Sequence, residues 1–136
     1  MLNAAFDVVD ARVNGHLAAP QLSNKRPAQA PEWTLTGGVS ATPRSRVSLS
    51  ANLRYEGPRF ADDQNTIRLA SAVTVDARAS YALTDALSLY VYGDNLFNAR
   101  VASTAAFQPV GSGATELVTN YAAPRIVGGG LSWTTQ

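Results

Sequence analysis

Apolar and polar residues alternate along much of the chain, and this alternation predicts β-strands. In residues 72–84 one parity is polar or small, whereas the other is apolar and consists of Val73, Val75, Ala77, Ala79, Tyr81 and Leu83. A period of two is the pattern of a strand with one apolar and one polar face. Residues 87–94 repeat it after the short segment 84–86, so the two segments are predicted to form a hairpin.

The register of this hairpin follows from matching the apolar faces. Apolar residues meet apolar residues when the facing pairs are Leu83 with Leu87, Tyr81 with Leu89 and Ala79 with Val91. A second hairpin is predicted in the same way from residues 33–41 and 47–55, with residues 42–46 as its turn. In the simplest register of that hairpin, Trp33 lies directly opposite Tyr55.

Two further strands are predicted at the ends of the chain. Residues 125–134 alternate around Gly128, Gly129 and Gly130, which indicate a bend or a close approach of the backbone. Residues 5–13 change parity, and a bulge near Val8 and Val9 would reconcile the two halves. The sequence therefore predicts an all-β, antiparallel up-and-down arrangement of about six strands.

Short and long connections alternate between these strands. The turns near Pro43 and Asp85 are short, whereas the loops 15–31, 57–71 and 98–123 are long and rich in turn-forming residues. Short turns on one side and long loops on the other are typical of transmembrane β-barrels. Strands of about ten residues also match a tilted span, which needs roughly 9–11 residues.

The distribution of charges and aromatic residues favours the same interpretation. Charged residues make up only 15% of the chain, against about 25% in typical soluble domains. Aromatic residues fall at the strand ends, as expected for membrane-interface belts; they are Trp33 and Tyr55 at the long-loop end, and Tyr81 and Trp133 near the short-turn end. A soluble β-sandwich or small-barrel binding module, with the apolar parity as its core, is the alternative.

The composition argues against several kinds of site. The formal net charge is +1, so the chain as a whole has no strong electrostatic attraction to nucleic acid or to anionic lipid. The chain has no cysteine and one histidine, His16, so we expect no metal site and no cofactor. A single histidine in a loop, without an ordered third group, is a poor basis for nucleophilic catalysis. We therefore expect that the chain is not an enzyme.

Four stretches resemble the C-terminal part of TonB-dependent outer-membrane receptors. They are Lys25-Arg26-Pro27 with Ala30-Pro31-Glu32-Trp33, Arg54-Tyr55-Glu56-Gly57-Pro58-Arg59-Phe60, Asp94-Asn95-Leu96-Phe97-Asn98, and Tyr121-Ala122-Ala123-Pro124-Arg125 leading to Gly130-Leu131-Ser132-Trp133. The Asn-Leu-Phe-Asn stretch that closes a strand is the most specific of them. Together they cover nearly the whole chain.

The resemblance implies a transmembrane barrel in the outer membrane of a Gram-negative bacterium. Such receptors have a plug inside a barrel of roughly 22 strands. They take up ferric siderophores, cobalamin or similar scarce ligands, with energy from the TonB complex. We expect residues 1–136 to be the C-terminal part of such a barrel, without a plug domain. The implied partners are outer-membrane lipid, the remainder of the barrel and its plug, and the TonB complex through that plug only.

The candidate ligand-contact residues lie on the polar face and on one external loop. On the polar face they are Asp76, Arg78, Tyr90, Tyr92 and Asp94, with Arg78 predicted to face Tyr92 and Asp76 to face Asp94. In and near the loop they are Arg54, Arg59, Asp62 and Asp63. The alternative is structural: ion pairs on the barrel wall and a solvated acidic pair in the loop.

Two arginines flank the turn near Pro43. Arg44 and Arg46 are candidates to contact periplasmic partners or anionic lipid headgroups. The alternative is that they only keep the turn hydrated.

Overall fold

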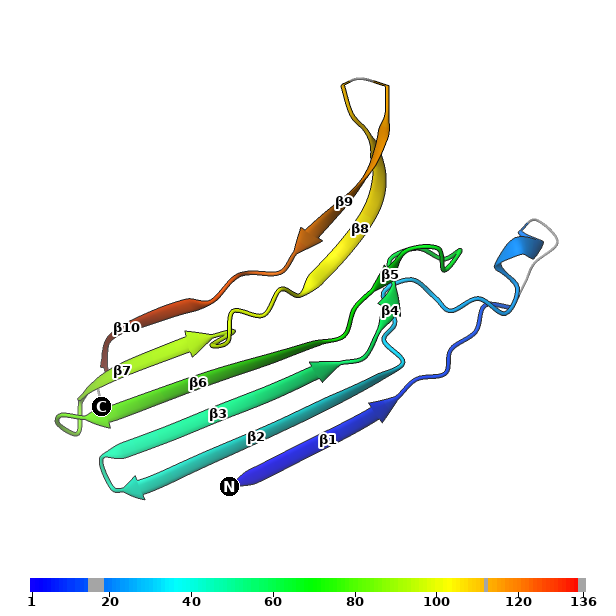
Figure 1. Ribbon diagram of the computed structural model, residues 1–136. Coiled ribbons are helices and arrows are strands. Elements are labelled where there is room, and N and C mark those ends of the chain that lie inside the picture. Colours follow the sequence, from blue (N-terminus) through cyan, green and yellow to red (C-terminus); the bar gives the residue numbers. More distant parts are fainter. Residues whose placement is uncertain (15–18, 112, 135–136) are drawn as a thin grey trace.

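Six strands form one antiparallel sheet in the computed structural model, which describes residues 1–14, 19–111 and 113–134 (Figure 1). Their order across the sheet is β1-β2-β3-β6-β7-β10. The strands are β1 (Leu2–Val8), β2 (Trp33–Arg44), β3 (Val47–Glu56), β6 (Ala72–Ala82), β7 (Leu87–Asp94) and β10 (Ile126–Trp133). The all-β, antiparallel up-and-down arrangement is confirmed, and the main sheet has the expected six strands.

The sheet has one apolar and one polar face. Cross-strand pairing puts the apolar parities of all six strands on the same side, because directly paired residues share a face. One such row runs from Leu2 through Val39, Ala51, Ala77 and Gly93 to Val127. The opposite face carries mainly Ser, Thr, Asn and Tyr. The predicted division into faces is therefore present in the fold.

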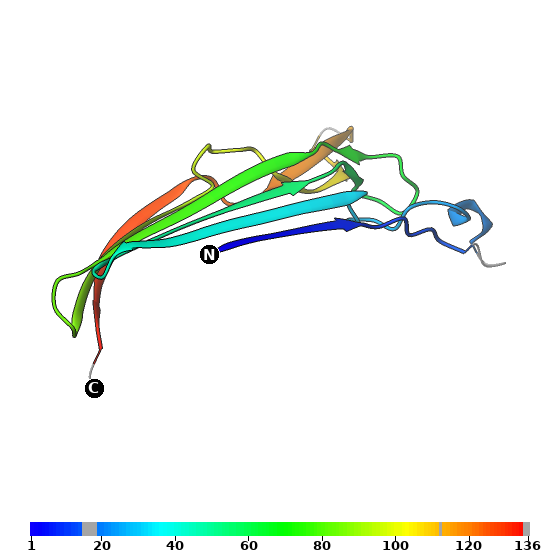
Figure 2. The same ribbon diagram turned by 90° about the horizontal axis from the view of Figure 1, so that it is seen from below.

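Nothing in the described residues covers the apolar face. Figure 2 shows the sheet as a single curved layer. Strands contact only their sheet neighbours, apart from a small contact between two strands in the long loops, β5 (Arg68–Leu69) and β8 (Ala102–Pro109). In the described part of the chain only Leu69 and Ala105 are buried apolar residues, while Leu49, Leu89 and Val91 are each 45% exposed or more. A soluble sheet would bury such a face in a core, so whatever covers this apolar face lies outside the described residues.

The hairpin of β6 and β7 has the predicted register. Tyr81 pairs with Leu89 and Ala79 pairs with Val91. Beyond the last pair, the Leu83 N–H donates to the Leu87 carbonyl at 2.9 Å, which closes the short turn. The ladder ends at Ala77 and Gly93, so the predicted pairing of the next two residues, Asp76 and Asp94, was wrong.

The predicted register of β2 and β3 was wrong by two residues. Leu35, and not Trp33, pairs with Tyr55. The reason is that β2 continues to Arg44, so the turn consists of Ser45 and Arg46 rather than residues 42–46. This shorter turn moves the register by three residues, and an irregularity between Ala41 and Arg44 moves it back by one. A shift of two residues leaves every side chain on its predicted face.

The first strand also differs from the prediction. It spans Leu2–Val8 and pairs with β2 in an unbroken register, from Leu2 with Val39 to Val8 with Trp33. The change of parity at Val9 marks the end of the strand, and the predicted bulge there is absent from the described ladder.

The long loops contain strands of their own. Residues 57–71 form a small ladder of β4 (Arg59–Phe60) with β5 (Arg68–Leu69). Residues 98–123, expected to be a loop, form a hairpin of β8 (Ala102–Pro109) with β9 (Thr115–Tyr121). This hairpin projects beyond the sheet at the long-loop end (Figure 1). A single turn of 3-10 helix, η1, spans Pro20–Leu22.

Candidate functional site on the polar face and the long loops

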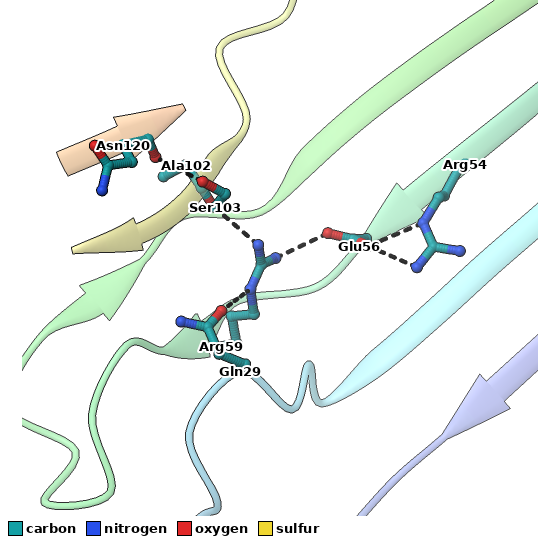
Figure 3. A network of polar contacts seen from close by, with 7 residues as sticks. All are labelled: Gln29, Arg54, Glu56, Arg59, Ala102, Ser103 and Asn120. Carbon is teal, nitrogen blue, oxygen red and sulfur yellow. Dashed lines mark hydrogen bonds and ion pairs between the residues drawn. The ribbon is translucent and has the colours of Figure 1, made fainter. Parts of the chain in front are cut away.

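Arg59 is the centre of a polar network that joins three segments of the chain. Its side chain is 8% exposed. Its Nη1 donates to Glu56 Oε2 at 2.9 Å, its Nη2 to the Ala102 carbonyl at 2.8 Å, and its Nε to Gln29 Oε1 at 3.3 Å (Figure 3). The guanidinium fork thus connects the end of β3, the start of β8 and the loop before β2. All three contacts are internal, and they support a structural role for Arg59.

Glu56 connects this network to the polar face. Its Oε1 accepts hydrogen bonds from Arg54 Nε at 2.9 Å and from Arg54 Nη2 at 2.6 Å. Arg54 and Glu56 are two residues apart on β3, so both lie on the polar face. Arg54 remains about half exposed, and its free edge is available to an anionic group.

Asp62 organises the loop between β4 and β5. Its carboxylate accepts hydrogen bonds from the N–H groups of Thr66 and Ile67, at 3.0 and 2.7 Å, and from the Thr66 hydroxyl at 2.8 Å. Desolvation by burial raises the pKa of Asp62. The hydrogen bonds from Ile67 and Thr66 together lower it more, so this pKa lies below its usual value of 3.8. All of these hydrogen-bond donors lie in the same loop, so the Asp62 carboxylate stabilises that loop.

Neighbouring residues attach the same loop to the segment before β2. Asp63 Oδ1 accepts from the Ala28 N–H at 2.9 Å. The Asn65 side chain accepts from the Arg26 N–H and donates to the Arg26 carbonyl, both at 2.8 Å. Asn65 has a positive φ of 59°, which asparagine tolerates better than most residues. The predicted acidic pair therefore stabilises loop structure.

Arg78, Tyr90 and Tyr92 form an aromatic patch on the polar face. The Arg78 guanidinium carbon lies 4.5 Å from the centroid of the Tyr90 ring, within cation–π range. The Tyr90 and Tyr92 rings are stacked with centroids 6.4 Å apart. Arg78 pairs with Tyr92 as predicted. In the described residues Arg78 makes no ion pair, so the predicted contacts with Asp76 and Asp94 are not formed.

The glycines of β10 make room for these rings. Gly128 pairs with Tyr92 and Gly130 with Tyr90. A Cβ added to either glycine would come within 2.8 Å of the tyrosine it pairs with. The rings therefore lie across the backbone of β10 on the polar face, which explains the close approach predicted from this glycine run.

Asp76 has a different partner from the one predicted. Its Oδ1 accepts from the Asn95 N–H at 2.8 Å. The Asn95 side chain exchanges hydrogen bonds with the backbone of Ala99 and also donates to the Ala123 carbonyl at 3.3 Å. Asn95 and Asn98 both have positive φ angles, of 49° and 53°. The Asn-Leu-Phe-Asn stretch thus acts as a hydrogen-bonded corner between β7 and the segment that enters β10.

A cavity that the sequence did not reveal lies at the base of the β8–β9 hairpin. It has a volume of about 500 Å³ and is lined by Asn98, Ala99, Arg100, Tyr121, Ala122 and Pro124. Arg100 and Tyr121 lie 21 residues apart in sequence, on either side of a hairpin that the alternation did not predict. If the hairpin of β8 and β9 had been predicted from the sequence, the proximity of Arg100 and Tyr121 would have followed from it.

The predicted interface aromatics occupy both ends of the apolar face. Trp33 and Tyr55 lie at the long-loop end and stack with ring centroids 4.2 Å apart. Phe6 extends this cluster, with its ring 6.1 Å from that of Trp33. Tyr81 and Trp133 lie near the short turns and are 44% and 69% exposed.

Two other features are absent from the described residues. No cluster of His, Cys, Asp or Glu there has the arrangement of a metal site. No helix there is long and apolar enough to cross a membrane. His16 lies outside the described residues.

The comparisons with known proteins agree with this geometry. A family model for the TonB dependent receptor-like β-barrel matches residues 2–96. Among solved structures, the chain resembles the ferric yersiniabactin uptake receptor FyuA from Yersinia pestis. The TM-score is 0.83 at 18% identity, over 97% of this chain and 20% of that one.

A second similar structure is the siderophore receptor PiuA from Acinetobacter baumannii. Its TM-score is 0.78 at 15% identity, over 97% of this chain and 19% of that one. The chain thus spans about a fifth of the length of these two proteins. A search of curated proteins gave no significant match.

Proposed function

Since the chain belongs to the TonB-dependent receptor-like β-barrel family, we propose that it forms the C-terminal part of the wall of an outer-membrane uptake receptor. The apolar face of its sheet contacts lipid, and the polar face lines the interior. The observation that carries this proposal is the uncovered apolar face. Exposed valines and leucines occur on this face in all six strands, and such a face is stable in water only if something covers it; hydrocarbon does so in a transmembrane barrel.

The proposed cargo is a ferric siderophore or a similar scarce ligand. One structurally similar protein is named as a siderophore receptor and the other as a ferric yersiniabactin uptake receptor. The polar face offers an exposed Arg54 edge and the patch of Arg78, Tyr90 and Tyr92, which suit an anionic ligand with planar groups or a plug segment. The cavity with Arg100 and Tyr121 offers the same chemistry at the long-loop end. Uptake would need the remainder of the barrel, the plug, and the TonB complex acting through that plug.

Four of the predicted ligand contacts have a structural role in this proposal: Arg59, Asp62, Asp63 and Asp76. Their polar groups are engaged within the chain, so they support the loops rather than contact ligand. Asp94 is exposed at the long-loop end of β7 and remains a candidate contact. No catalytic step is proposed, because the family consists of receptors.

Membrane fractionation tests the proposal. Cells producing the protein in its natural genomic context are separated into soluble, inner-membrane and outer-membrane fractions. We expect the chain in the outer-membrane fraction, resistant to carbonate extraction. A soluble, cooperatively folding monomer would contradict the proposal and favour a soluble binding module.

A further inference from the structure

An irregularity near the end of β2 turns an arginine onto the apolar face. Between Ala41 and Arg44 the register shifts, so three steps of β2 lie opposite two steps of β3. A bulge of this kind reverses the parity of the residues that follow it. Arg44 pairs directly with Val47, and Val47 pairs with Tyr81. Arg44 therefore shares the face of the valine and the tyrosine instead of pointing to the polar side.

A groove lies on the same face just above this row. Its volume is about 540 Å³. Ala51, Ala77 and Ala79 contribute its small side chains, and Leu49, Val91 and Leu96 its large ones. Leu96 lies over Gly93, toward the long-loop end. The groove is thus an apolar hollow on the apolar face, one row from Arg44.

The groove and the arginine are close together. Leu49 and Ala79 pair with each other, and the next row toward the turn on this face contains Arg44, Val47 and Tyr81. Two residues along a strand span about 7 Å. A positive charge therefore lies roughly one row from a hydrocarbon-like hollow.

The charge at this end of the sheet is mainly positive. Arg44 and Arg46 are both exposed, and neither makes an ion pair within the described ranges. The other charged side chain in the described short turns is Asp85, between β6 and β7. Tyr81, in the row of Arg44, is an amphipathic residue of the kind that lies at headgroup level.

We propose that this surface binds a phospholipid with an anionic headgroup. The headgroup lies against Arg44 and Arg46, and one acyl chain occupies the groove. This proposal rests on the membrane placement proposed above. An amphiphile fits because the site combines cationic groups at one end with an apolar hollow beside them. A peptide would leave its backbone polar groups unpaired in such a hollow. A zwitterionic lipid, whose cationic group offsets its phosphate, would gain less from the arginines than a lipid with a net negative headgroup.

Native mass spectrometry of the extracted protein tests the proposal. The protein, with the barrel strands it assembles with in its natural genomic context, is extracted from outer membranes in mild detergent. It is titrated with phosphatidylglycerol or phosphatidylcholine that carry identical acyl chains. We expect one molecule of phosphatidylglycerol to bind with high affinity. Arg44→Gln and Arg46→Gln should each lower the preference over phosphatidylcholine about fivefold, the effect of one arginine near a charged headgroup.

Two further variants separate the groove from general charge. Ala79→Leu fills the groove without changing charge, and it should weaken binding of the high-affinity lipid. Arg68→Gln removes an exposed arginine in the β4–β5 segment, and it should leave the preference unchanged. An unchanged preference in Arg44→Gln and Arg46→Gln, unchanged binding in Ala79→Leu, or an equal loss in Arg68→Gln would each overturn the proposal. A co-purifying protein that occupies this face in place of lipid would do the same.

Folding and membrane placement are checked separately. If Arg44→Gln and Arg46→Gln fail to assemble, the Arg44→Lys/Arg46→Lys double variant replaces them, because it keeps both charges. This double variant should retain the preference for phosphatidylglycerol. Loss of the preference in a folded double variant contradicts the proposal. Recovery of the wild-type protein from the soluble fraction would instead refute the membrane placement. Recovery from the outer membrane without lipid preference would refute only the lipid site.

Discussion

Arg59 Nη1 donates to Glu56 Oε2 at 2.9 Å, although Gly57 and Pro58 interrupt the strand between the two residues. The glycine–proline break ends β3 and lets the chain turn, so that the arginine side chain folds back toward the carboxylate. The same guanidinium then reaches the Ala102 carbonyl at the start of β8. One buried side chain thereby fixes the base of the projecting β8–β9 hairpin to the wall of the sheet.

Replacing Arg59 should detach that hairpin. Arg59→Ala leaves Glu56 and the Ala102 carbonyl without their partner, and breaking a buried, hydrogen-bonded pair costs about 3 kcal/mol. We expect a lower free energy of unfolding in denaturant titration and faster hydrogen exchange at the β8 amides. Arg59→Lys should recover only part of the loss, because an ammonium group cannot reproduce the planar fork. Arg68→Ala, at an exposed position, is the control; an equal effect there would contradict the prediction.

The two faces of the sheet should tolerate charge differently. Val75 and Leu89 both lie on the apolar face. An arginine there costs about 2–4 kcal/mol at the bilayer midplane and less toward the interface, where Leu89 pairs with Tyr81. We expect Val75→Arg to reduce strongly the amount of protein assembled in the outer membrane, and Leu89→Arg to reduce it less, measured by fractionation and protease protection. Ser80→Arg, on the polar face of β6, should be tolerated. Equal tolerance at all three positions would refute the assignment of the faces.

The sequence predicted those parts of the fold that depend on the period of two. The faces of β3, β6 and β7 follow directly from alternation, and the short turn at Asp85 leaves one register that pairs apolar with apolar residues. The family resemblance, drawn from four motifs, is confirmed by the match to residues 2–96 and by the two similar structures.

What the sequence could not predict depends on irregular backbone or on distant partners. The two-residue turn at Ser45 and Arg46 and the one-residue bulge between Ala41 and Arg44 together move the β2–β3 register by two residues from the predicted one, and a shift of two leaves the apolar pattern unchanged. Gln29, Glu56 and Ala102 are far apart in the chain, so no local pattern joins them around Arg59. The spacing of Arg54 and Glu56 was a usable signal, because two charges two residues apart share a face. Asn95 and Asn98 act through left-handed backbone, which a polar loop sequence permits but does not require.

The glycine run of β10 should be sensitive to a single methyl group. A Cβ at Gly128 would lie 2.8 Å from the Tyr92 ring. Gly128→Ala must therefore displace the far end of the Tyr92 side chain, and overpacking of this kind costs about 1 kcal/mol when the neighbour can move. In the Tyr92→Ser background the same substitution should cost far less, and a double-mutant cycle on the free energy of unfolding measures the difference. Gly111→Ala, with open space around it, is the control; additive effects of Gly128→Ala and Tyr92→Ser would show that the ring does not need the glycine.

The loop between β4 and β5 should lose order in acid through Asp62. Its pKa is lower in the folded protein than the usual 3.8, so the ionised carboxylate stabilises the folded loop. This stabilisation is fully present above pH 3.8 and is lost as the pH falls below that value, through the folded-state pKa. Hydrogen exchange at the Thr66 and Ile67 amides, corrected for the intrinsic pH dependence of exchange, should show protection that falls in this range. Asp62→Asn should already be less protected at neutral pH and should lack the acid transition. Asp85→Asn, in a short turn at the other end of the sheet, should leave these amides unchanged, and an acid transition that persists in Asp62→Asn would assign it to another group.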